Sequence, residues 1–572
     1  MDQRSGTVPT MASLPIPRIL PSFQGAQRNL SADLVAGLTV WAVLVPEALA
    51  YATIAGVSPV VGLYAAPSAL VLYAIFGSSR HLVVGPMAAT AALSAAAIAD
   101  AATDTNALAL TAGLALVVGV FGLLASFARL GFLASFISEP VLKGFIVGMA
   151  LTIIVGQLPK LFGVSGGDGD FFEKSWDLVT KLGDTQLDTF LVGFGSLALV
   201  LLLRRFLPKV PAPLVAVALG VAAVTLLDLA DKGVDIVGHI DSGLPSVGVP
   251  DLGWNDYVAL IGSAVGILLV GFAEGLGAAK TYAQKEQYPI DANAELMGLG
   301  TANLASGLTS GMVVNGSLSK TAVNGSAGAT SQVSGMFVAV LTIITLLFLT
   351  GLFENLPEAT LAAVVVAAVI ELVDIESLKR LYRLTTPGLR SIYGTAARAD
   401  FIAAVAAMGG VLIFDTLPGL FIGIAVSVLL IVYRASRPHV ATLGRSADGP
   451  HWVDLERHPD ATTVEGTVVV RPESGLFYAN ADNVHQEIRD RAVDGVTVIV
   501  LDLADVPAID LTASEAVLAL GEDLDRMGVE LRIARDIGQV RDLLAEAGAG
   551  ALVDRAYPTV EAAVRGGAAS SG

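Results

Sequence analysis

The sequence predicts a polytopic α-helical membrane protein with about fourteen transmembrane segments, followed by a soluble α/β domain. The mean hydropathy is +0.70, and only 15% of the 572 residues are charged. A soluble protein of this length would have roughly a quarter of its residues charged. The long apolar runs stop after Ser436, where the composition becomes that of a soluble domain. A purely soluble fold would have to bury many helices that are apolar all round, which argues against that alternative.

Apolar runs close to the spanning length of roughly 20 residues recur along the chain. Two examples are "LTAGLALVVGVFGLLASFA" from Leu110 and "VSGMFVAVLTIITLLFLTGLF" from Val333. We expect the transmembrane domain at 33–435, with segments that start near residues 33, 58, 84, 106, 139, 190, 212, 255, 291, 317, 331, 358, 398 and 418. Residues 1–32 contain no apolar run, so they are not a cleaved signal peptide and are predicted as a cytoplasmic lead-in.

The distribution of charges in the loops predicts the orientation in the membrane. Basic residues follow alternate segments, as with Arg80, Arg204 and Lys280. The loops between them are acidic, as in "SGGDGDFFEKSWD" and "FENLPEA". The positive-inside rule therefore predicts an even number of spans with both termini in the cytoplasm.

The C-terminal part is acidic and separate from the membrane part. From Arg437 onward the chain has 23 acidic and 12 basic residues. This charge argues against nucleic acid and against anionic lipid as partners of the tail. We expect a linker at 436–463, a folded domain at 464–566 and a flexible tail at 567–572. The chain has no cysteine, which excludes disulfides and thiolate metal sites.

Two halves of seven segments would run antiparallel, and the sequence carries signs of such a repeat. Glu47 lies in the middle of the first apolar run, and Glu274 in the middle of the eighth. The third segment begins "VGPMAATAAL" and the tenth begins "NGSLSKTAVN", so both are short and rich in small residues. Paired short segments that follow a glycine predict a binding site at the midplane of a transporter.

The tenth segment is too polar to face lipid, so we interpret it as a half-helix that begins inside the protein. Two half-helix N-termini that face each other offer free backbone N–H groups and positive dipole ends. With Lys320 and the hydroxyls of Ser317 and Ser319, they predict an anion site. Two alternatives stay open: the serines cap the helix, and Lys320 is a structural or snorkelling charge.

The chain resembles the SulP/SLC26 family of anion transporters over nearly its whole length. The resemblance rests on the stretch from Ala32 to Ala65, on "FGSSRHLVVGP", on "NAELMGLGTANLASGL" and on "GSLSKTAV". It implies a 7+7 inverted repeat divided into core and gate domains, a homodimer, and a multi-pass location in the bacterial inner membrane. It also implies an anion site between the third and tenth helices, formed by Glu47, Tyr51, Met87, Ala88, Gly316, Ser317, Leu318, Ser319 and Lys320.

The resemblance also implies coupling to protons. Glu274 matches a carboxylate that proton-coupled members use, although a structural pair with a polar neighbour is the alternative. Many members have glutamine at the position of Glu47 and arginine at that of Lys320. A second acid beside an anion site is repulsive unless it is protonated or paired, so Glu47 is a second candidate proton site. It is also a candidate partner of Lys320 or a packing residue at a proline kink.

The tail resembles a STAS domain. The stretches "EGTVVVRPESGLFYAN" and "VTVIVLDLADVPAIDLTASEAVLALGEDLDRMGVELRIA" predict the order strand, strand, helix, strand, helix, strand. In related regulators a serine after the loop aspartate is phosphorylated, but here Leu511 follows Asp510. Thr512 is predicted to be a helix N-cap, with Glu515 completing a capping box. We therefore expect a docking or regulatory domain that binds a cytosolic protein, without a phosphorylation switch.

We expect secondary active transport of a small anion, with proton-coupled symport of sulfate or a small dicarboxylate by an elevator-like motion. Sodium-coupled bicarbonate uptake, an anion channel or exchanger, and a signalling scaffold built on the STAS domain are the alternatives. We expect no enzyme, because there is no P-loop, no histidine cluster with metal spacing and no triad. No cofactor is expected, and the coupling ion is H⁺, with Na⁺ as the alternative.

Two further interpretations, each of a pair of residues, concern structure. Arg80 and His81 are predicted to be topology markers and surface anchors. Glu295 and Asn303 belong to the family signature and are predicted to tie helices together.

Overall fold

The structure of the protein is a computed structural model. It describes residues 20–23, 29–101, 106–132, 138–167, 169–207, 210–240, 242–370, 373, 375–384, 396–414, 416–449, 451–493, 495–554 and 556–566. The chain forms two compact units, Met1–Ser427 and Val428–Gly572, which are described one after the other. Most of the predicted lead-in and the predicted tail at 567–572 lie outside the described residues.

The first unit contains the spanning segments that the sequence predicts. By length and composition, seven helices in the described part of the chain can cross a membrane: α1 (Leu30–Ile54), α4 (Ala107–Phe127), α5 (Glu139–Phe162), α7 (Leu187–Phe206), α10 (Ile261–Lys285), α13 with its continuation to Phe353 (α-helical over Val333–Ile344) and α18 (Thr416–Ser436). Five shorter apolar helices accompany them: α2 (Val60–Phe76), α3 (Ala88–Ala101), α8 (Ala212–Leu227), α14 (Glu358–Ile370) and α17 (Ala396–Phe414). The less apolar α11 (Ala292–Leu308) and α12 (Leu318–Ser326) complete the set.

Three short helices were not predicted. They are α6 (Phe171–Lys181), α9 (Trp254–Ala259) and α15 (Ile375–Leu384). The predicted start near 255 falls on α9, because the chain makes one short helix there before α10 begins at Ile261. Composition does not distinguish such a lead-in from the first turn of a span.

The helices of the first unit pack through small residues. In the pair α4 and α11, a Cβ added to Gly119 would lie 2.5 Å from the backbone nitrogen of Leu304, and one added to Gly122 would lie 2.9 Å from the Cα of Gly300. The two backbones therefore touch. This is typical of helices in a membrane, where the hydrophobic effect does not drive helix association and close van der Waals packing does. Large apolar side chains such as Phe206 and Leu226 instead point outward, 72% and 79% exposed.

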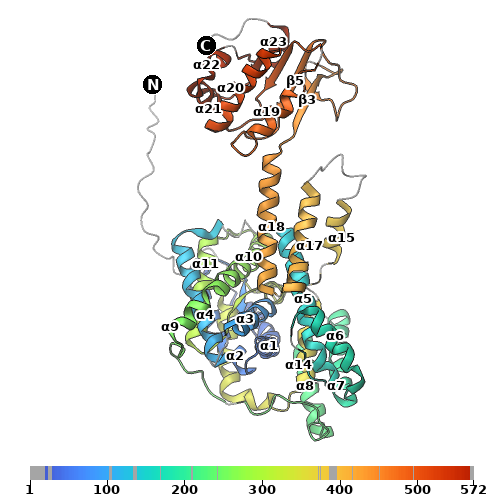
Figure 1. Cartoon of the computed structure of the whole chain (residues 1–572). Coiled ribbons are helices and arrows are strands. Elements are labelled where there is room, and N and C mark those ends of the chain that lie inside the picture. The colour runs from blue at the N-terminus through green and yellow to red at the C-terminus, as the bar shows by residue number, and fades with distance from the viewer. Residues whose placement is uncertain are drawn as a thin grey trace, which may run out of the picture. The chain divides into compact units, whose positions relative to one another are not determined.

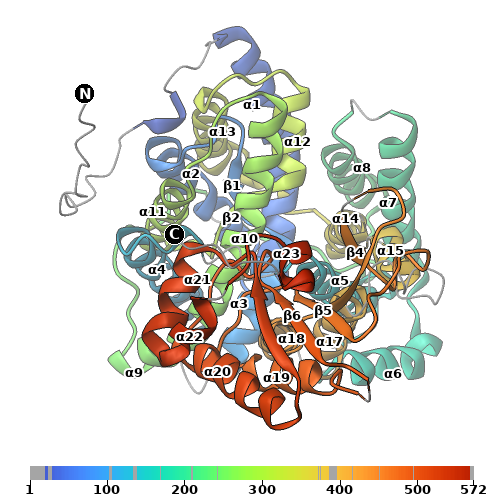
Figure 2. The same ribbon diagram turned by 90° about the horizontal axis from the view of Figure 1, so that it is seen from above.

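The spanning segments form a 7+7 inverted repeat and divide into two groups. The core group contains α1–α4 and α9–α13, and the gate group contains α5–α8, α14, α15, α17 and the first half of α18. In Figure 2, α2, α4 and α11 lie on the left and α7, α8 and α14 on the right. The groups meet where α1 contacts α8 and α14, and where α3 contacts α5.

The second unit is an α/β domain with a five-stranded sheet in the order β4-β3-β5-β6-β7 (Figure 1). The strands are β3 (Val440–Arg445), β4 (Trp452–Asp454), β5 (Thr467–Pro472), β6 (Val498–Asp502) and β7 (Glu530–Ala534). β5, β6 and β7 are parallel, whereas β3 is antiparallel to β4 and to β5. One face of the sheet packs on α19 (Ala481–Arg489), α20 (Leu511–Arg526) and α21 (Gly538–Leu544), and the other on α23 (Val560–Arg565).

Three predictions for this domain are wrong. The segment predicted as a linker, 436–463, contributes β3 and β4 to the sheet. The stretch predicted as two strands forms one, β5, because Leu476 makes only an isolated bridge to Ile509. The N-cap of α20 is Asp510, whose Oδ1 accepts from the Ala513 N–H at 2.8 Å, whereas Thr512 lies inside the helix. Aspartate caps as well as threonine does, so the earlier residue took the position.

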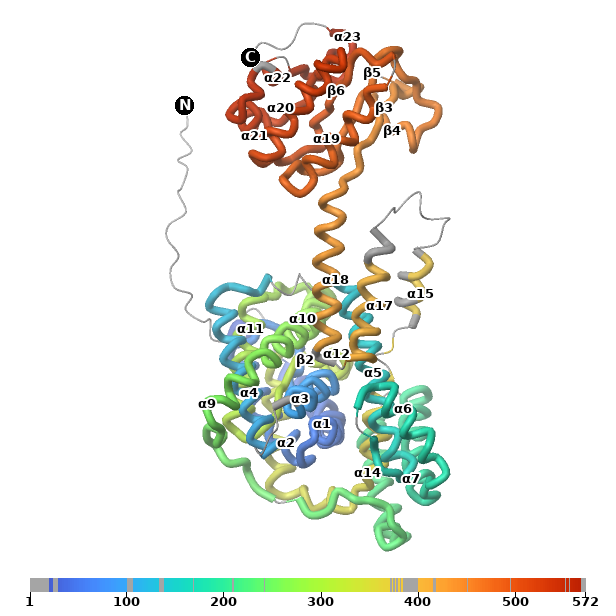
Figure 3. The backbone as a smooth tube through the Cα atoms, viewed as in Figure 1, coloured from blue at the N-terminus to red at the C-terminus, as the bar shows by residue number. Residues whose placement is uncertain are grey.

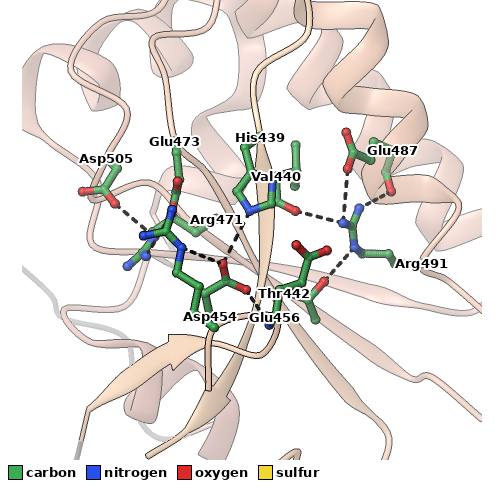
Figure 4. Close-up of polar contacts among 11 residues, drawn as sticks. His439, Val440, Thr442, Asp454, Glu456, Arg471, Glu473, Glu487, Arg491 and Asp505 are labelled. Atoms are coloured by element: carbon green, nitrogen blue, oxygen red, sulfur yellow. Dashed lines mark hydrogen bonds and ion pairs between the residues drawn. The ribbon is translucent and has the colours of Figure 1, made fainter. Parts of the chain in front are cut away.

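Arginine contacts fix the first strands of this sheet (Figure 4). Arg491 follows α19 and donates to the Val440 carbonyl at 2.8 Å and to the Thr442 hydroxyl at 2.9 Å. Arg471 on β5 pairs with Asp505 at 3.0 Å and with Glu473 at 3.3 Å. The contacts of Arg491 attach β3 to the helical side of the domain, which explains why the segment before residue 464 folds with it.

Candidate anion site

The predicted site lies where the third and tenth segments meet as two short extended strands. β1 (Val83–Gly85) pairs antiparallel with β2 (Asn315–Ser317), with Val84 opposite Gly316. α12 begins directly after β2, and two residues separate β1 from the start of α3. Since the strands run in opposite directions, the two helices leave the pair in opposite directions and their N-terminal ends face each other. Figure 3 shows β2 and α12 beside α10.

The start of α12 is capped by its own serine. Ser317 is the N-cap, and its Oγ accepts from the Lys320 N–H at 3.3 Å. The hydroxyls of Ser317 and Ser319 lie 3.2 Å apart. The Thr321 hydroxyl donates to the Ser317 carbonyl and accepts from the Val83 N–H at 3.0 Å, which links the helix to β1. The cap interpretation of Ser317 therefore holds in the structure, and it leaves room for a ligand, because one cap satisfies only one of the free N–H groups of a helix start.

Lys320 is buried and contacts both predicted neighbours from α1. Its side chain is 1% exposed, and its Nζ lies 2.8 Å from the Oε2 of Glu47. The same nitrogen donates to the Pro86 carbonyl at 3.1 Å and lies 5.0 Å from the centre of the Tyr51 ring. Lys320 therefore does not snorkel to a surface. Glu47 is its partner, which was one of the alternatives that the sequence left open, and the pair joins α1 to the start of both half-helices.

Glu274 lies on α10, beside β2. The next residue, Gly275, packs against Asn315 and Gly316, where a Cβ would lie 3.1 Å from the Asn315 Oδ1. The Oε2 of Glu274 is buried and has no hydrogen-bond partner among the described residues. Glu274 also interacts electrostatically with Lys320. Lys320 is therefore paired with Glu47, and Glu274 is a second carboxylate whose charge acts on the same region.

The remaining predicted residues surround the two helix starts. Met87 lies between β1 and α3, Ala88 is the first residue of α3, and both are buried, 8% and 5% exposed. Gly316 lies in the strand pair, where a Cβ would meet Leu82 and Gly275 at about 3 Å, so no larger residue fits. Leu318 and Ser319 are exposed in the first turn of α12, so other described parts of the chain leave this turn uncovered.

Two buried side-chain amides hydrogen-bond to the backbone just before β1 and β2 and so fix the position of these strands. Asn303 on α11 donates to the Val314 carbonyl and accepts from the Val314 N–H, both at 2.9 Å, just before β2. Gln332 donates to the carbonyls of Ser79 and Leu82, also at 2.9 Å, just before β1. Each amide therefore supplies hydrogen bonds to backbone N–H or carbonyl groups of an irregular segment, which inside a membrane protein have no water to bind.

Two buried carboxylates hold the adjoining loops. Glu295 accepts from the Tyr73 hydroxyl at 2.7 Å and from the backbone N–H groups of Ser78 and Ser79 at 2.8 and 2.9 Å. Asp33 accepts from the N–H groups of Thr330 and Ser331. Glu295 comes from the second half and supports the loop of the first half, and Asp33 does the reverse. The hydrogen bonds of Glu295 and Asn303 therefore confirm the prediction that these two residues tie neighbouring elements together.

The prediction for His81 is wrong. His81 is 5% exposed, and its ring nitrogens lie 3.0 Å from the Tyr288 hydroxyl and from the Ala329 carbonyl. Arg80 lies over the ring of Tyr288 at 4.7 Å. A charge pattern places such residues on one side of a membrane, but it does not reveal that the loop folds inward against the neighbouring loop.

The comparison with protein families matches both units. The model of the sulfate permease family matches residues 30–394, and that of the STAS domain matches residues 458–563. The chain belongs to the sulfate permease family. This is an anion-transporting family of multi-pass membrane proteins, and its SulP/SLC26 membership, inferred from motifs, is confirmed.

Two relatives cover most of the chain. A protein from Mycobacterium tuberculosis named "Probable sulfate transporter" is 36% identical over 94% of this chain and 95% of its own. "Sulfate transporter 4.1, chloroplastic" from Arabidopsis thaliana is 30% identical over 92% of this chain and 78% of its own. The chain is therefore similar to sulfate permeases over both units.

Solved structures share the fold. The murine Slc26a9 anion transporter in the inward-facing state aligns with a TM-score of 0.82 at 22% identity, over 96% of this chain and 92% of that one. The transmembrane domain of the cyanobacterial bicarbonate transporter BicA aligns with a TM-score of 0.58 at 22% identity, over 70% of this chain and 98% of that one. At this identity the alignments establish the fold alone.

Sequence reasoning missed one residue of the site. Asn315 is 1% exposed, and its Nδ2 has no hydrogen-bond partner among the described residues. It lies in β2 against Gly271 and Gly275 of α10, next to Glu274. The sequence contained a signal for it, because an asparagine at the start of a buried half-helix needs a hydrogen-bond partner. In the structure, the described chain supplies no partner to its amide nitrogen.

Proposed function

We propose that the protein is a secondary active transporter that takes up a small divalent oxyanion, sulfate or a dicarboxylate, together with protons. The observation that carries the proposal is the buried Lys320, held between Glu47 and two helix starts that face each other. Opposed helix N-termini attract anions through their N–H groups and dipoles. The names of the relatives support sulfate as the first substrate to test.

The proposed binding residues are those at the two helix starts. The N–H groups around Met87, Ala88, Gly316, Leu318 and Ser319 would hold the oxyanion, with Lys320 as the fixed charge and Tyr51 as the wall behind it. The unpartnered Nδ2 of Asn315 is a further donor at β2. Each group offers a hydrogen bond to an oxygen acceptor, and the negative ligand strengthens all of them.

Proton coupling follows from the charge balance of the site. Glu47 and Glu274 together exceed the single positive charge of Lys320, so an incoming dianion meets a site that is already negative. Protonation of Glu274, whose Oε2 has no partner, removes one negative charge without breaking the Glu47–Lys320 pair. Anion and proton binding then favour each other, which is what symport requires. In the proposed cycle the core group carries both across the gate group in alternating access.

Orientation and assembly complete the proposal. We propose that both termini lie in the cytoplasm of a bacterial cell, which the alternation of basic and acidic loops supports. We propose that the chain works as a homodimer and that its STAS domain docks a cytosolic protein, since the domain lacks the serine acceptor after Asp510. No metal or organic cofactor enters the cycle.

The test is uptake of labelled sulfate and, in parallel, labelled fumarate into proteoliposomes, with and without an inward proton gradient. Uptake of either that rises with the gradient supports symport and identifies the substrate class. Uptake that needs sodium and accepts bicarbonate would replace the proposal with the sodium-coupled alternative. A large uncoupled current across a bilayer would replace it with a channel.

A further inference from the structure

Two buried polar groups without partners lie close to each other beside β2. Asn315 is 1% exposed, and its Nδ2 has no hydrogen-bond partner among the described residues. The Oε2 of Glu274 on α10 is likewise buried and without a partner in the described part of the chain. The amide nitrogen is a donor and the carboxylate oxygen an acceptor, so each is the kind of group that the other lacks. Buried polar groups are nearly always paired, so two complementary ones left unpaired in one region indicate a function.

The packing of α10 on β2 places the amide next to the carboxylate. A Cβ added to Gly271 would lie 3.2 Å from the Asn315 Cγ, and one added to Gly275 would lie 3.1 Å from its Oδ1. The amide therefore lies against the strip of α10 that these two glycines leave bare. Glu274 is only about 60° around the helix from Gly271, so it borders the same strip.

The geometry of β2 places the same amide toward the two helix starts. Side chains two residues apart on a strand point to the same face, so Asn315 shares a face of β2 with Ser317, about 7 Å along the strand. Ser317 is the residue that caps α12 through the Lys320 N–H. Across the strand pair Asn315 lies opposite Gly85, just before α3. The amide is therefore adjacent both to the carboxylate on α10 and to the proposed anion site.

Few charged groups surround Glu274. The described titratable groups on α10 and on the elements packed against it are Asp100, Asp256, Tyr257, Lys280, Tyr282, Lys285, Glu295 and Lys320. Lys320 is paired with Glu47, and Glu295 accepts from the Tyr73 hydroxyl. The others lie on α9 or near the C-terminal ends of α3 and α10. The Asn315 amide is therefore an unengaged donor beside Glu274.

One amide nitrogen can join the carboxylate and the anion in a single hydrogen-bonded unit. It carries two N–H groups, so one can donate to Glu274 and the other to an oxygen of the bound anion. Two acceptors held by one nitrogen lie about 5 Å apart. Two negative charges at that distance repel strongly in a buried site. A proton on Glu274 removes the repulsion, and the carbonyl oxygen of the protonated carboxyl still accepts the hydrogen bond.

We propose that Asn315 is the bridge that links anion binding to proton binding. Before the anion binds, the amide donates to the ionised Glu274 and so favours the carboxylate without a proton. An arriving oxyanion takes the second N–H, and Glu274 then binds a proton from the solvent on the side from which the anion enters. The inference rests on the proposed function, and it names the residue through which the two ligands favour each other.

Two variants of the same shape test the bridge. Asn315→Thr keeps a hydroxyl donor beside α10, whereas Asn315→Val has no donor, and both side chains suit an extended strand. The measurement is the Kd of labelled sulfate, with labelled fumarate in parallel, for the purified full-length protein from pH 5.5 to pH 8. The wild-type Kd should rise with pH, by at most about tenfold per pH unit for one proton bound per anion.

The ratio of the Kd at pH 8 to the Kd at pH 5.5 measures the coupling. It should fall about tenfold in Asn315→Val, because a hydrogen bond to a charged group is lost, and stay within about twofold of the wild-type ratio in Asn315→Thr. In weakly buffered solution, sulfate should make the wild type take up protons, and Asn315→Val should take up fewer. In a Glu274→Gln background, which lacks the proton site, Asn315→Val should leave the ratio unchanged.

The two proposals fail in different ways. A wild-type ratio in Asn315→Val would overturn the bridge and leave proton coupling intact. A Kd that rises by the same factor at every pH would make Asn315 an anion ligand without a coupling role. Equal changes in Asn315→Thr and Asn315→Val would mean that the amide only fills space beside the glycines, which also overturns the bridge. A wild-type protein whose binding of sulfate and of fumarate does not vary with pH would overturn the proposed function, and the bridge with it.

Discussion

Glu274 is the residue on which the proposed proton coupling depends. Glu274→Gln keeps the size of the side chain and removes its charge, so it mimics the protonated state. We expect the variant to fold and to lose the stimulation of uptake by acid. The measurement is the initial rate of uptake across a pH series in proteoliposomes. Glu286→Gln, at an exposed residue that follows the same helix, should keep the wild-type profile. A Glu274→Gln variant with wild-type pH dependence would remove Glu274 from the coupling.

The Glu47–Lys320 pair is a structural element as well as a site element. Both side chains are nearly inaccessible, at 3% and 1% exposure. Lys320→Met leaves the carboxylate of Glu47 buried without its partner, which costs about 3–5 kcal/mol of unfolding free energy. The double variant Glu47→Gln with Lys320→Met removes both charges and should lose less than the sum of the single variants. Thermal unfolding in detergent measures the stability of the wild type, the single variants and the double variant. Additive losses of stability would show that the two residues are not coupled.

At the residue level the sequence predicted most of the residues that meet around the two helix starts, for reasons that are physical, and their role in binding stays a prediction. A lysine, serines and small residues cannot face lipid, so "NGSLSKTAVN" had to lie inside, and Glu47 and Glu274 stood out as charges in apolar runs. The structure brings these residues together. The sequence did not predict which carboxylate pairs with Lys320. The pairing depends on how α1 packs against α12, and these helices are hundreds of positions apart in the sequence.

At the element level the two half-helices are predictable, but the strands that precede them are not. β1 and β2 have three residues each and pair across a sequence separation of more than 200 residues. No periodicity shows in three residues, and a strand this short is stable only because Asn303 and Gln332 hold the segments before it. The same limit explains the error at 436–463. β3 and β4 look like a linker in composition and become strands through their contacts with β5 and Arg491.

Two helices of the STAS domain are joined by an ion pair that should make the domain sensitive to acid. His485 on α19 lies 3.0 Å from Asp523 on α20. The hydrogen bond from His485, with the charges of Arg526 and Arg489, holds the pKa of the Asp523 carboxyl below its usual range, although burial acts in the opposite direction. A lowered folded-state pKa contributes stability above the unfolded pKa, and this is lost as the pH falls through the folded value.

Asp523→Asn should therefore make the stability of the domain less dependent on pH in the range below about pH 4, where the unfolded carboxyl becomes protonated first. At neutral pH the variant should be less stable than the wild type. Urea unfolding of residues 428–572, followed by circular dichroism, measures both. Asp525→Asn, an exposed neighbour on the same helix, is the control. Equal pH dependence in the wild type and in Asp523→Asn would show that the carboxyl has an ordinary pKa in the folded domain.

At the scale of the whole molecule, the proposed mechanism requires the core group to move past the gate group. A link between the groups should stop transport, whereas a link within one group should not. Ala95 on α3 and Gly156 on α5 line a cavity between the groups, so cysteines at these positions accept a cleavable linker of roughly 10 Å across a helix contact. Because the chain has no native cysteine, the linker can react only with the two introduced thiols.

We expect linked Ala95→Cys with Gly156→Cys to lose nearly all uptake and to regain it when the linker is cleaved. The matched control joins α7 to α14 inside the gate group, at Ser196 and Thr360, whose hydroxyl oxygens lie 3.0 Å apart. Ser196→Cys with Thr360→Cys should form a disulfide and keep transporting, because both helices belong to the same group. Single-cysteine variants treated with the linker test for blockage of the cavity by the reagent itself. Full uptake by the protein linked between α3 and α5 would mean that the anion crosses without movement of the two groups, which is the behaviour of a channel.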